Sequence, residues 1–364
     1  NQTWENNEED NNTALTKVTI KPLFSKWHSG VSVDKHDLLY SYYFPYEWST
    51  DTKSNDQTYD AEYSSLVFPT LSLIKGIEFH DNGTFDTYVD LWHYDKKQIP
   101  SYGTLWPSEP WDVTAATERL VKENKLSYSK SDANIKGIDQ LSLNLPVQAE
   151  MIKAELIKMI NEKFIPNPLK GIVSLDYAIE RYNASINWID DRSNAIIGNG
   201  PYYLSEFNPS GGVVTLNSFR DNTYPIKTGE YSKLENPPQL SIEKINVPKF
   251  IRIGQPFEFS IDLNVRNASQ QTSQFNGIIN YFITDRNNRL VIQDELIVND
   301  NNNNTSLSNN KTIANSQDEP IKISLNSSQT SELIPGPYKL KLITTTMDSP
   351  KPLIQENTLI ARPR

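Results

Sequence analysis

The chain has 364 residues, a formal net charge of −10 at pH 7 and no cysteine. The missing cysteines exclude disulfides, thiolate nucleophiles and the zinc and iron–sulfur sites that use cysteine ligands. An acidic chain without a Lys/Arg-rich stripe repels phosphate backbones, which argues against a nucleic-acid partner. Its 7 Trp, 18 Tyr and 13 Phe residues can build cores in a polar chain, and we therefore expect folded domains.

The beginning of the chain predicts a strand followed by a capped helix. Residues 17–23 alternate apolar and polar side chains, as a half-buried strand does. Asp34 can accept the free N–H groups of a helix that begins at Lys35, and Asp37 in the first turn suits the helix dipole. Pro45 is expected to end this helix.

Turn residues and periodicity predict further elements up to residue 224. The Asn82-Gly83 pair lies between two alternating runs, which favours a β-hairpin. Residues 61–74 are apolar enough to form a buried helix. Three more helices and then two strands are predicted over residues 114–123, 147–164, 175–188, 200–207 and 212–219.

The character of the sequence changes after Tyr224. Residues 226–240 contain a proline pair and are expected to form a linker. Beyond the linker only strands and turns are predicted, over residues 240–246, 257–266, 276–284, 289–298, 320–325, 337–346 and 353–361. Seven short strands separated by turns favour a β-sandwich. We therefore expect an α/β domain over residues 1–225 and a β-sandwich module over residues 241–364.

No pattern of catalytic residues stands out. The histidines form no HExxH metal motif, the chain has no G-x-S-x-G nucleophile motif, and Asp190-Asp191 suits a solvated helix end better than a glycosidase pair. The segment from Gly198 to Pro201 lacks the Lys-Ser/Thr of a phosphate loop and suits a tight turn into a strand. We therefore expect no enzyme activity, no metal and no cofactor.

Five aromatic side chains gather in a proline-rich stretch: Trp92, Tyr94, Tyr102, Trp106 and Trp111. Two interpretations stay open. The side chains either pack in a core, or they line a ligand cleft, where exposed indoles supply a large contact area at low entropic cost. Their burial distinguishes the two.

Asn-x-Ser/Thr triplets favour a glycosylated, extracellular protein. The candidate acceptors are Asn82, Asn183, Asn267, Asn304, Asn310 and Asn326. In a chain this rich in Asn, Ser and Thr some triplets arise by chance. Glycan acceptors must lie on the surface, however, and several of these triplets fall in predicted turns or loops.

Two separated segments resemble one protein family. Residues 27–38, Trp-His-Ser-Gly-Val-Ser-Val-Asp-Lys-His-Asp-Leu, resemble the W-H-D-G-x-P-x-T-x-x-D-V signature of the family 5 extracellular solute-binding proteins, which bind oligopeptides, dipeptides or nickel for ABC transporters. Residues 197–204 resemble the I-G-T-G-P-Y-x-L segment of that family. The matching residues are Trp27, His28, Gly30, Asp37, Gly198, Gly200, Pro201 and Tyr202. Ser29 and Asp34 depart from the pattern, because the family has Asp and Thr at these positions.

The resemblance covers residues 1–225 and implies an α+β fold, a type II periplasmic-binding-protein-like lobe that is incomplete relative to the family. Residues 334–342 resemble the start of a late strand in immunoglobulin-like surface modules, which implies an all-β immunoglobulin-like sandwich after the lobe. The family resemblance further implies a non-catalytic protein that binds a peptide or another small solute. It gives Trp106, Trp111 and Tyr202 as the candidate ligand-binding residues.

The same resemblance implies the membrane subunits of an ABC transporter as partners. It also implies an extracellular or cell-surface location, with the membrane anchor outside this chain. Because family members normally continue into a second lobe, a second chain could complete the binding domain. The alternative is a glycosylated structural or envelope-layer (S-layer) protein that reuses the solute-binding scaffold for assembly. Completeness of the cleft distinguishes these two hypotheses.

Overall fold

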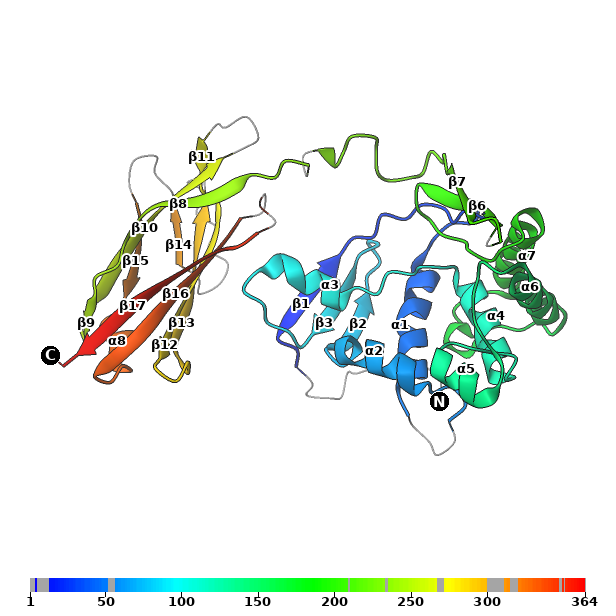
Figure 1. Ribbon diagram of the computed structural model, residues 1–364, viewed down its shortest axis with the longest axis horizontal. Coiled ribbons are helices and arrows are strands. Elements are labelled where there is room, and N and C mark those ends of the chain that lie inside the picture. The colour runs from blue at the N-terminus through cyan, green and yellow to red at the C-terminus, as the bar shows by residue number, and fades with distance from the viewer. Residues whose placement is uncertain are drawn as a thin grey trace. The chain divides into compact units, whose positions relative to one another are not determined.

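The computed structural model describes most of the chain as two units. The described residues are 4, 13–51, 56–208, 210–232, 235–266, 272–299, 311–314, 320–346, 349 and 351–363. Asn1–Trp92 and Gln98–Lys227 form the first unit, and His93–Lys97 and Thr228–Arg364 form the second. The first unit is helical with small sheets and the second is rich in strands (Figure 1), which confirms the expected mixed α+β class. No helix within these described ranges is both long and apolar enough to cross a bilayer.

Most of the regular secondary structure of the first unit is helical. The helices are α1 (Lys35–Ser49), α2 (Ala61–Leu71), η1 (Lys96–Gln98, whose first two residues belong to the second unit), α3 (Ile99–Gly103), α4 (Trp111–Lys122), α5 (Lys130–Lys136), α6 (Pro146–Asn161), η2 (Asn167–Leu169) and α7 (Leu175–Arg192). One antiparallel sheet has the order β1 (Thr16–Ile20), β3 (Phe85–Val89), β2 (Ile74–Phe79). Two smaller sheets pair β4 (Leu126–Ser127) with β5 (Asp139–Gln140) and β6 (Tyr202–Asn208) with β7 (Val213–Ser218).

Helix α1 begins where the sequence predicts and ends later. The Asp34 side chain accepts a backbone N–H of the first turn, and the Asp34 N–H donates to the Asp37 carboxylate, which completes a capping box. The expected end near Pro45 is wrong, because the helix continues to Ser49 with the proline inside it. Proline removes one helical hydrogen bond, but the following turn is held by Trp48, which is buried in the core.

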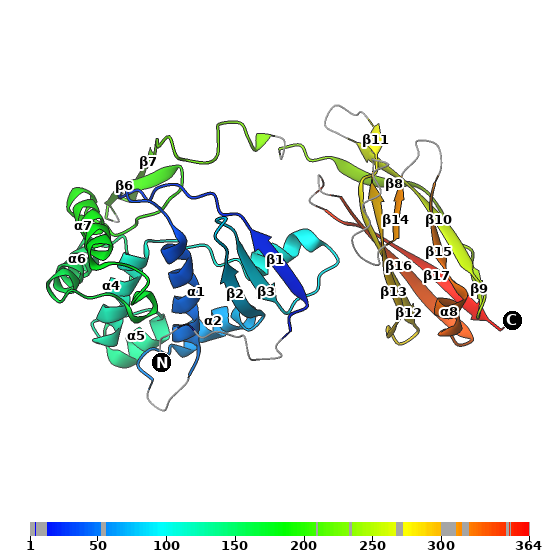
Figure 2. The same cartoon turned by 180° about the vertical axis from the view of Figure 1, so that it is seen from behind.

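Helix α1 has two buried faces. On one face, Leu38 and Tyr42 pack against side chains of β2 and β3. On the other, Tyr40 and Trp48 pack into the larger core that α4, α6 and α7 build. Figures 1 and 2 show α1 between the three-stranded sheet and this group of helices. The helix is therefore the element that joins the two layers of the first unit.

The predicted hairpin is confirmed and the predicted buried helix is only partly correct. Strands β2 and β3 pair in antiparallel register, and Gly83 between them has φ of 80°, in the left-handed region that favours glycine. Helix α2 forms within residues 61–74, but β2 begins at Ile74 and the Leu66 side chain is 74% exposed. Leu71 and Ile74 are buried, so the apolar composition of this stretch corresponds to burial only at its end.

Helices α4, α6 and α7 form the main core with α1. The apolar stripe predicted for α6 is confirmed, since Ile152, Leu156 and Met159 are fully buried. They pack in one cluster with Leu120 of α4 and Tyr182 of α7. Both α4 and α7 are longer than their predicted ranges, because α4 begins three residues earlier than residue 114 and α7 continues four residues beyond residue 188.

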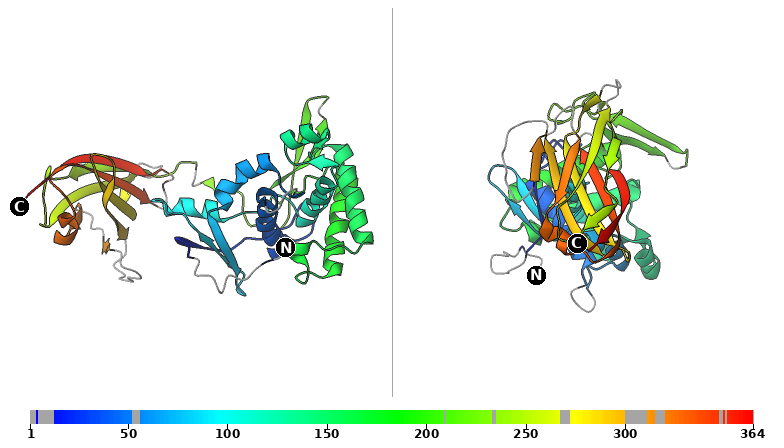
Figure 3. Two further views of the ribbon diagram at one scale, coloured as in Figure 1. Left: turned by 90° about the horizontal axis from the view of Figure 1, so that it is seen from below. Right: turned by 90° about the vertical axis from the view of Figure 1, so that its left-hand side faces the viewer.

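The second unit is built from two sheets around one core. One sheet pairs β10 (Phe257–Arg266) with β8 (Gln239–Asn246), β11 (Thr272–Gln274) and β15 (Ile321–Leu325). The other has the order β14 (Lys311–Ala314), β13 (Leu290–Asn299), β12 (Gly277–Asp285), β16 (Gly336–Thr346), β17 (Leu353–Arg362), β9 (Phe250–Arg252). Alternate side chains of both sheets, such as Phe259, Tyr281 and Leu340, share the core. Figure 3 shows the strands of this unit curled into a half-barrel.

All seven strands predicted for this unit are confirmed, but the prediction of strands and turns alone is wrong. A short helix, α8 (Ser327–Ser331), follows β15, and Asn326 caps it. The turn before β16 is fixed by Tyr338, whose hydroxyl accepts from the N–H of Ile334 (3.0 Å) and donates to its carbonyl (3.1 Å). The short strands β9, β11 and β14 have too few residues to show a period in the sequence.

Candidate functional site

The two segments that resemble the solute-binding family are in contact with each other. Residues 27–38 lead into α1 and residues 197–204 lead into β6, and His28 joins them. Its backbone N–H donates to the Gly198 carbonyl (2.8 Å), and its Nδ1 accepts from the Gly198 N–H (3.2 Å). Its Nε2 lies 3.0 Å from the carbonyl oxygen of Gly200. These bonds fit a neutral imidazole with its proton on Nε2.

The surroundings of His28 favour that neutral form. The ring packs among Trp188, Tyr203 and Phe219, with the Phe219 centroid 4.9 Å away. Burial lowers the pKa of His28. A Cβ atom on Gly198 would lie 3.2 Å from the imidazole, so glycine permits this close approach. His28 is therefore a link between two chain segments, not a residue free to act as a base.

Asp37, in the first of these segments, belongs to a buried charge network. Trp27 Nε1 donates to the Asp37 carboxylate (3.1 Å), and the Arg181 guanidinium donates to both of its oxygens. Through Nε, Arg181 also donates to Asp112 (3.2 Å). None of the three charged residues is more than 2% exposed. Burial opposes the charge of Arg181, but the two carboxylates outweigh burial and raise its pKa, so the guanidinium stays charged.

The surface of the first unit is hollowed beside this network. A pocket of about 360 Å³ lies between α1 and the loop over residues 104–110, within the range of about 300–1,000 Å³ that small-molecule sites occupy. Its aromatic walls come from Tyr40 and Phe44 of α1, Tyr63 of α2, and Trp106 and Trp111. Its charged lining residues are Asp37 and Glu109.

The structure separates the three predicted ligand-binding residues. Trp106 lines the pocket, is 41% exposed and stacks on Phe24 at 6.2 Å between ring centroids. Trp111 also touches the pocket, but it is 1% exposed and packs against Tyr182 in the core. Tyr202 is 59% exposed on β6 and does not line the pocket. Of the three, Trp106 alone presents an accessible aromatic face to a ligand there.

The aromatic stretch around Trp106 does not form a single site. Trp92 and Tyr102 are exposed and lie outside the pocket lining. Tyr94 belongs to the second unit, where its carbonyl accepts a hydrogen bond from Asn280 (3.1 Å). Both sequence interpretations therefore hold for different members: Trp111 is core, and Trp106 lines a pocket.

Glu109 is the site residue that the sequence does not single out. It lies in the loop just before α4, where an acidic residue is usually explained by the helix dipole. Its carboxylate accepts a hydrogen bond from Thr114 Oγ1 (3.3 Å), and burial raises its pKa. The sequence signal was a glutamate between two prolines in an aromatic stretch, which by itself does not reveal a pocket.

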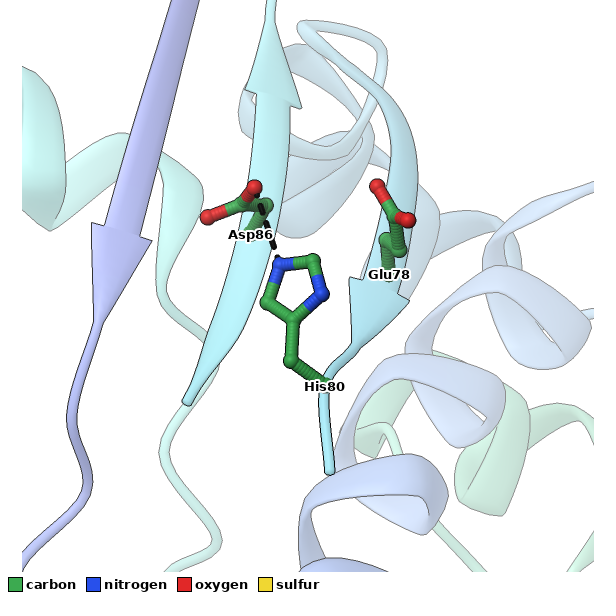
Figure 4. Close-up of side chains that lie close together, drawn as sticks. All are labelled: Glu78, His80 and Asp86. Carbon is green, nitrogen blue, oxygen red and sulfur yellow. Dashed lines mark ion pairs between the residues drawn. The ribbon is translucent and has the colours of Figure 1, made fainter. Parts of the chain in front are cut away.

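Glu78, His80 and Asp86 form a group of possible metal ligands across β2 and β3 (Figure 4). His80 Nε2 lies 3.0 Å from Asp86 Oδ2, but Lys17 Nζ lies 3.0 Å from the same oxygen and Thr19 donates to the other. Hydrogen bonds from Thr19 and Lys17 lower the pKa of Asp86 to about 2. An ammonium group beside the shared oxygen repels a metal cation, so the arrangement fits an ion-pair network that ties β1 to the hairpin.

The candidate glycosylation sites differ in accessibility. Asn82 is exposed in the β2–β3 turn, where its side chain accepts from Thr84. Asn183 is exposed but lies in the middle of α7, and the Ser185 of its triplet is buried. Asn326 is exposed and caps α8. Asn267, Asn304 and Asn310 lie outside the described residues.

Comparisons with known proteins give no family. No family model matches the sequence, and the search of curated proteins gave no match. Crystal structures of a β-glucosidase from Listeria innocua, in complex with isofagomine and with glucose, are similar to part of this chain at 12% and 11% identity and a TM-score of 0.20. Each alignment covers 35% of this chain and 16% of the β-glucosidase. At that TM-score the similarity carries no argument about fold or function.

Proposed function

We propose that this chain is a non-catalytic solute-binding protein that takes a peptide or another small solute into the pocket between α1 and the loop over residues 104–110. The observation that carries the proposal is the pocket itself. It combines aromatic walls, an exposed indole at Trp106 and few charged groups, a lining typical of ligand sites. Capture of a solute needs a shaped surface and a few oriented polar groups, and no reactive side chain.

The contact between the two motif segments supports membership of the family 5 solute-binding proteins. Segments that resemble one family at two distant places in the sequence are expected to meet if the chain shares that family's fold, and His28 bonds to both Gly198 and Gly200. We infer a type II periplasmic-binding-protein-like lobe. Its partners would be the membrane subunits of an ABC transporter, at an extracellular or cell-surface location with the anchor outside this chain.

The second unit supports a spacer or docking role. The hydroxyl of Tyr338 bonds to the backbone four residues upstream, near the start of β16, as in the tyrosine corner of immunoglobulin-like sandwiches. The strand orders β8-β10-β15 and β13-β12-β16-β17 also suit that architecture. We infer an immunoglobulin-like module that supports the binding unit.

A second candidate function is a structural or envelope-layer protein that uses the same scaffold for assembly. The sheet of β6 and β7 favours it, because Tyr202, Val214 and Leu216 are each 59% exposed there. Exposed apolar side chains on a two-stranded sheet are typical of a surface that another chain covers. Among the described residues there is also no second α/β unit that could close over the pocket. A second chain would have to supply it.

Native mass spectrometry of the protein purified from its source tests the two functions together. Solute binding predicts that a small molecule is retained. Assembly predicts that a partner chain is bound and that no small molecule is retained. Calorimetry with a mixed set of dipeptides and amino-acid derivatives then tests the pocket. Trp106→Ala should weaken the binding of any ligand found. Trp92→Ala is the matched control, because Trp92 is also an exposed indole and lies outside the pocket. Equal effects of both substitutions would contradict the assignment of this pocket as the solute-binding site.

A further inference from the structure

Glu109 places a carboxyl group at an aromatic pocket that has no basic lining residue among the described residues. Glu109 is one of the lining residues, and its carboxylate accepts a hydrogen bond from the Thr114 hydroxyl. Within the described ranges no Lys, Arg or His side chain lines the pocket, and Glu109 forms no ion pair. A negative charge on this carboxylate can therefore be stabilised only by the dipole of α4, by solvent or by a ligand.

The described charged groups around the pocket supply no free positive charge. Asp37 lines the pocket as well, and it shares the single Arg181 guanidinium with Asp112. Glu118 is buried and accepts a hydrogen bond from the hydroxyl of Tyr40, which lines the pocket. A pocket with acidic lining residues and no basic one among the residues described favours cations over anionic ligands.

The aromatic walls suit the same kind of ligand. The faces of Trp and Tyr rings carry a negative quadrupole that attracts ammonium groups. Trp106 supplies an exposed indole, and Tyr63 lies near Glu109, since burial and then the Glu109 carboxylate raise the pKa of Tyr63. A carboxylate and aromatic faces around one small volume are the elements of an ammonium-binding cage.

We propose that this pocket binds a small organic cation, with Glu109 as the counter-charge of its ammonium group and Trp106 and Tyr63 packed against its carbon atoms. The inference rests on the proposed solute-binding function and names its ligand class. A volume of about 360 Å³ fits a monoamine with an apolar or aromatic body. It is close to the lower end of the range for ligand sites, about 300–1,000 Å³.

Calorimetry on the full chain with three matched probes tests the ligand class: 2-phenylethylamine, 2-phenylethanol and phenylacetate. At neutral pH they share one aromatic body and carry positive, zero and negative charge. We expect the amine to bind at least about tenfold more tightly than the alcohol, because a hydrogen bond to a charged group is worth that factor. We expect no binding of phenylacetate.

Two variants assign the charge to Glu109. Glu109→Gln keeps the shape of the side chain, and it should weaken amine binding at least about tenfold while leaving alcohol binding unchanged. Glu150→Gln is the matched control, because Glu150 is an exposed glutamate on α6 away from the pocket. Circular dichroism spectra and melting temperatures verify that both variants fold.

The possible results separate the inference from the function beneath it. Equal binding of amine and alcohol, or undiminished amine binding by Glu109→Gln, would overturn the cation assignment and leave solute binding intact. Tighter binding of phenylacetate would do the same. If neither these probes nor the dipeptide and amino-acid set gives a heat of binding that depends on Trp106, the solute-binding function itself fails.

Discussion

Arg181→Met should destabilise the first unit strongly and leave the second unit unchanged. The Arg181 side chain is 2% exposed, and its guanidinium bonds to Asp37, to Asp112 and to the carbonyl of Ser32 (2.8 Å). Methionine replaces much of the side-chain volume but none of these donors. It leaves two buried carboxylates without their counter-charge.

The magnitude follows from those contacts. Removing one partner of a buried ion pair costs about 3–5 kcal/mol, because the remaining charge stays buried and unpaired. For a unit of this size each kcal/mol lowers the melting temperature by about 2–4 °C, so the expected shift is roughly 6–20 °C. Domains typically have a free energy of unfolding of about 5–15 kcal/mol, so this variant is expected to retain a marginally stable fold.

Tryptophan fluorescence in a urea titration measures this change in one unit alone. All 7 tryptophans lie at or before residue 188 and outside residues 93–97, so they report on the first unit. Lys153→Met is the control, because Lys153 pairs with Glu150 and Asp190 on the surface, where ion pairs contribute about 0–1 kcal/mol.

The addition of Asp37→Asn and Asp112→Asn to Arg181→Met should recover part of the lost stability, because the unpaired charges are then removed. A loss of less than about 1 kcal/mol in Arg181→Met, equal to that of the control, would refute the network as a determinant of the fold.

Three further outcomes are expected. Burial lowers the pKa of His28 from 6.5, so the unfolded chain binds more protons below about pH 6.5, and the free energy of unfolding of the first unit should fall as pH drops through that value. His28→Asn should flatten this pH dependence in urea titrations. An unchanged slope would contradict the neutral imidazole bonded to Gly198. Tyr338→Phe should destabilise the second unit by about 1–3 kcal/mol in unfolding followed by far-ultraviolet circular dichroism, while the unfolding transition of the first unit, followed by tryptophan fluorescence, stays unchanged. Tyr231→Phe is the control, because Tyr231 is exposed. Equal losses in both variants would contradict a stabilising role for the Tyr338 hydroxyl. Burial raises the pKa of Glu109 above 4.5, so this carboxylate is protonated at a higher pH than an ordinary glutamate as the pH falls. Binding of 2-phenylethylamine should therefore already weaken at mildly acidic pH. Calorimetry should find no such pH-dependent loss in Glu109→Gln.

Local signals in the sequence were sufficient for many elements. The capping box of α1, the Asn-Gly hairpin and the period of α6 each depend on residues within a few positions of one another, so they can be seen without knowledge of tertiary contacts. The seven strands of the second unit were found for the same reason, because alternation over five or more residues is a local pattern.

The features that sequence reasoning missed depend on distant partners. Helix α1 passes Pro45 because its last turn is packed in a core that α4 and α6 complete many residues later. The sequence indicates a favourable first-turn charge for Asp37, whereas its principal partner, Arg181, lies 144 residues further on. Glu109 became a candidate once the fold placed it in the pocket with Tyr63, a residue from a different helix.

The residues that carry the family resemblance and the residues that line the pocket are almost separate sets. His28, Gly198 and Gly200 use their polar atoms to bind one another, so they are available to hold two segments together and not to contact a solute. Asp37 alone belongs to both sets, and its carboxylate is bonded to Arg181. A chain could therefore keep the signature and change its ligand, or keep its scaffold and lose the ligand altogether. The nature of the solute must therefore be sought in the pocket residues, above all in the loop that carries Glu109.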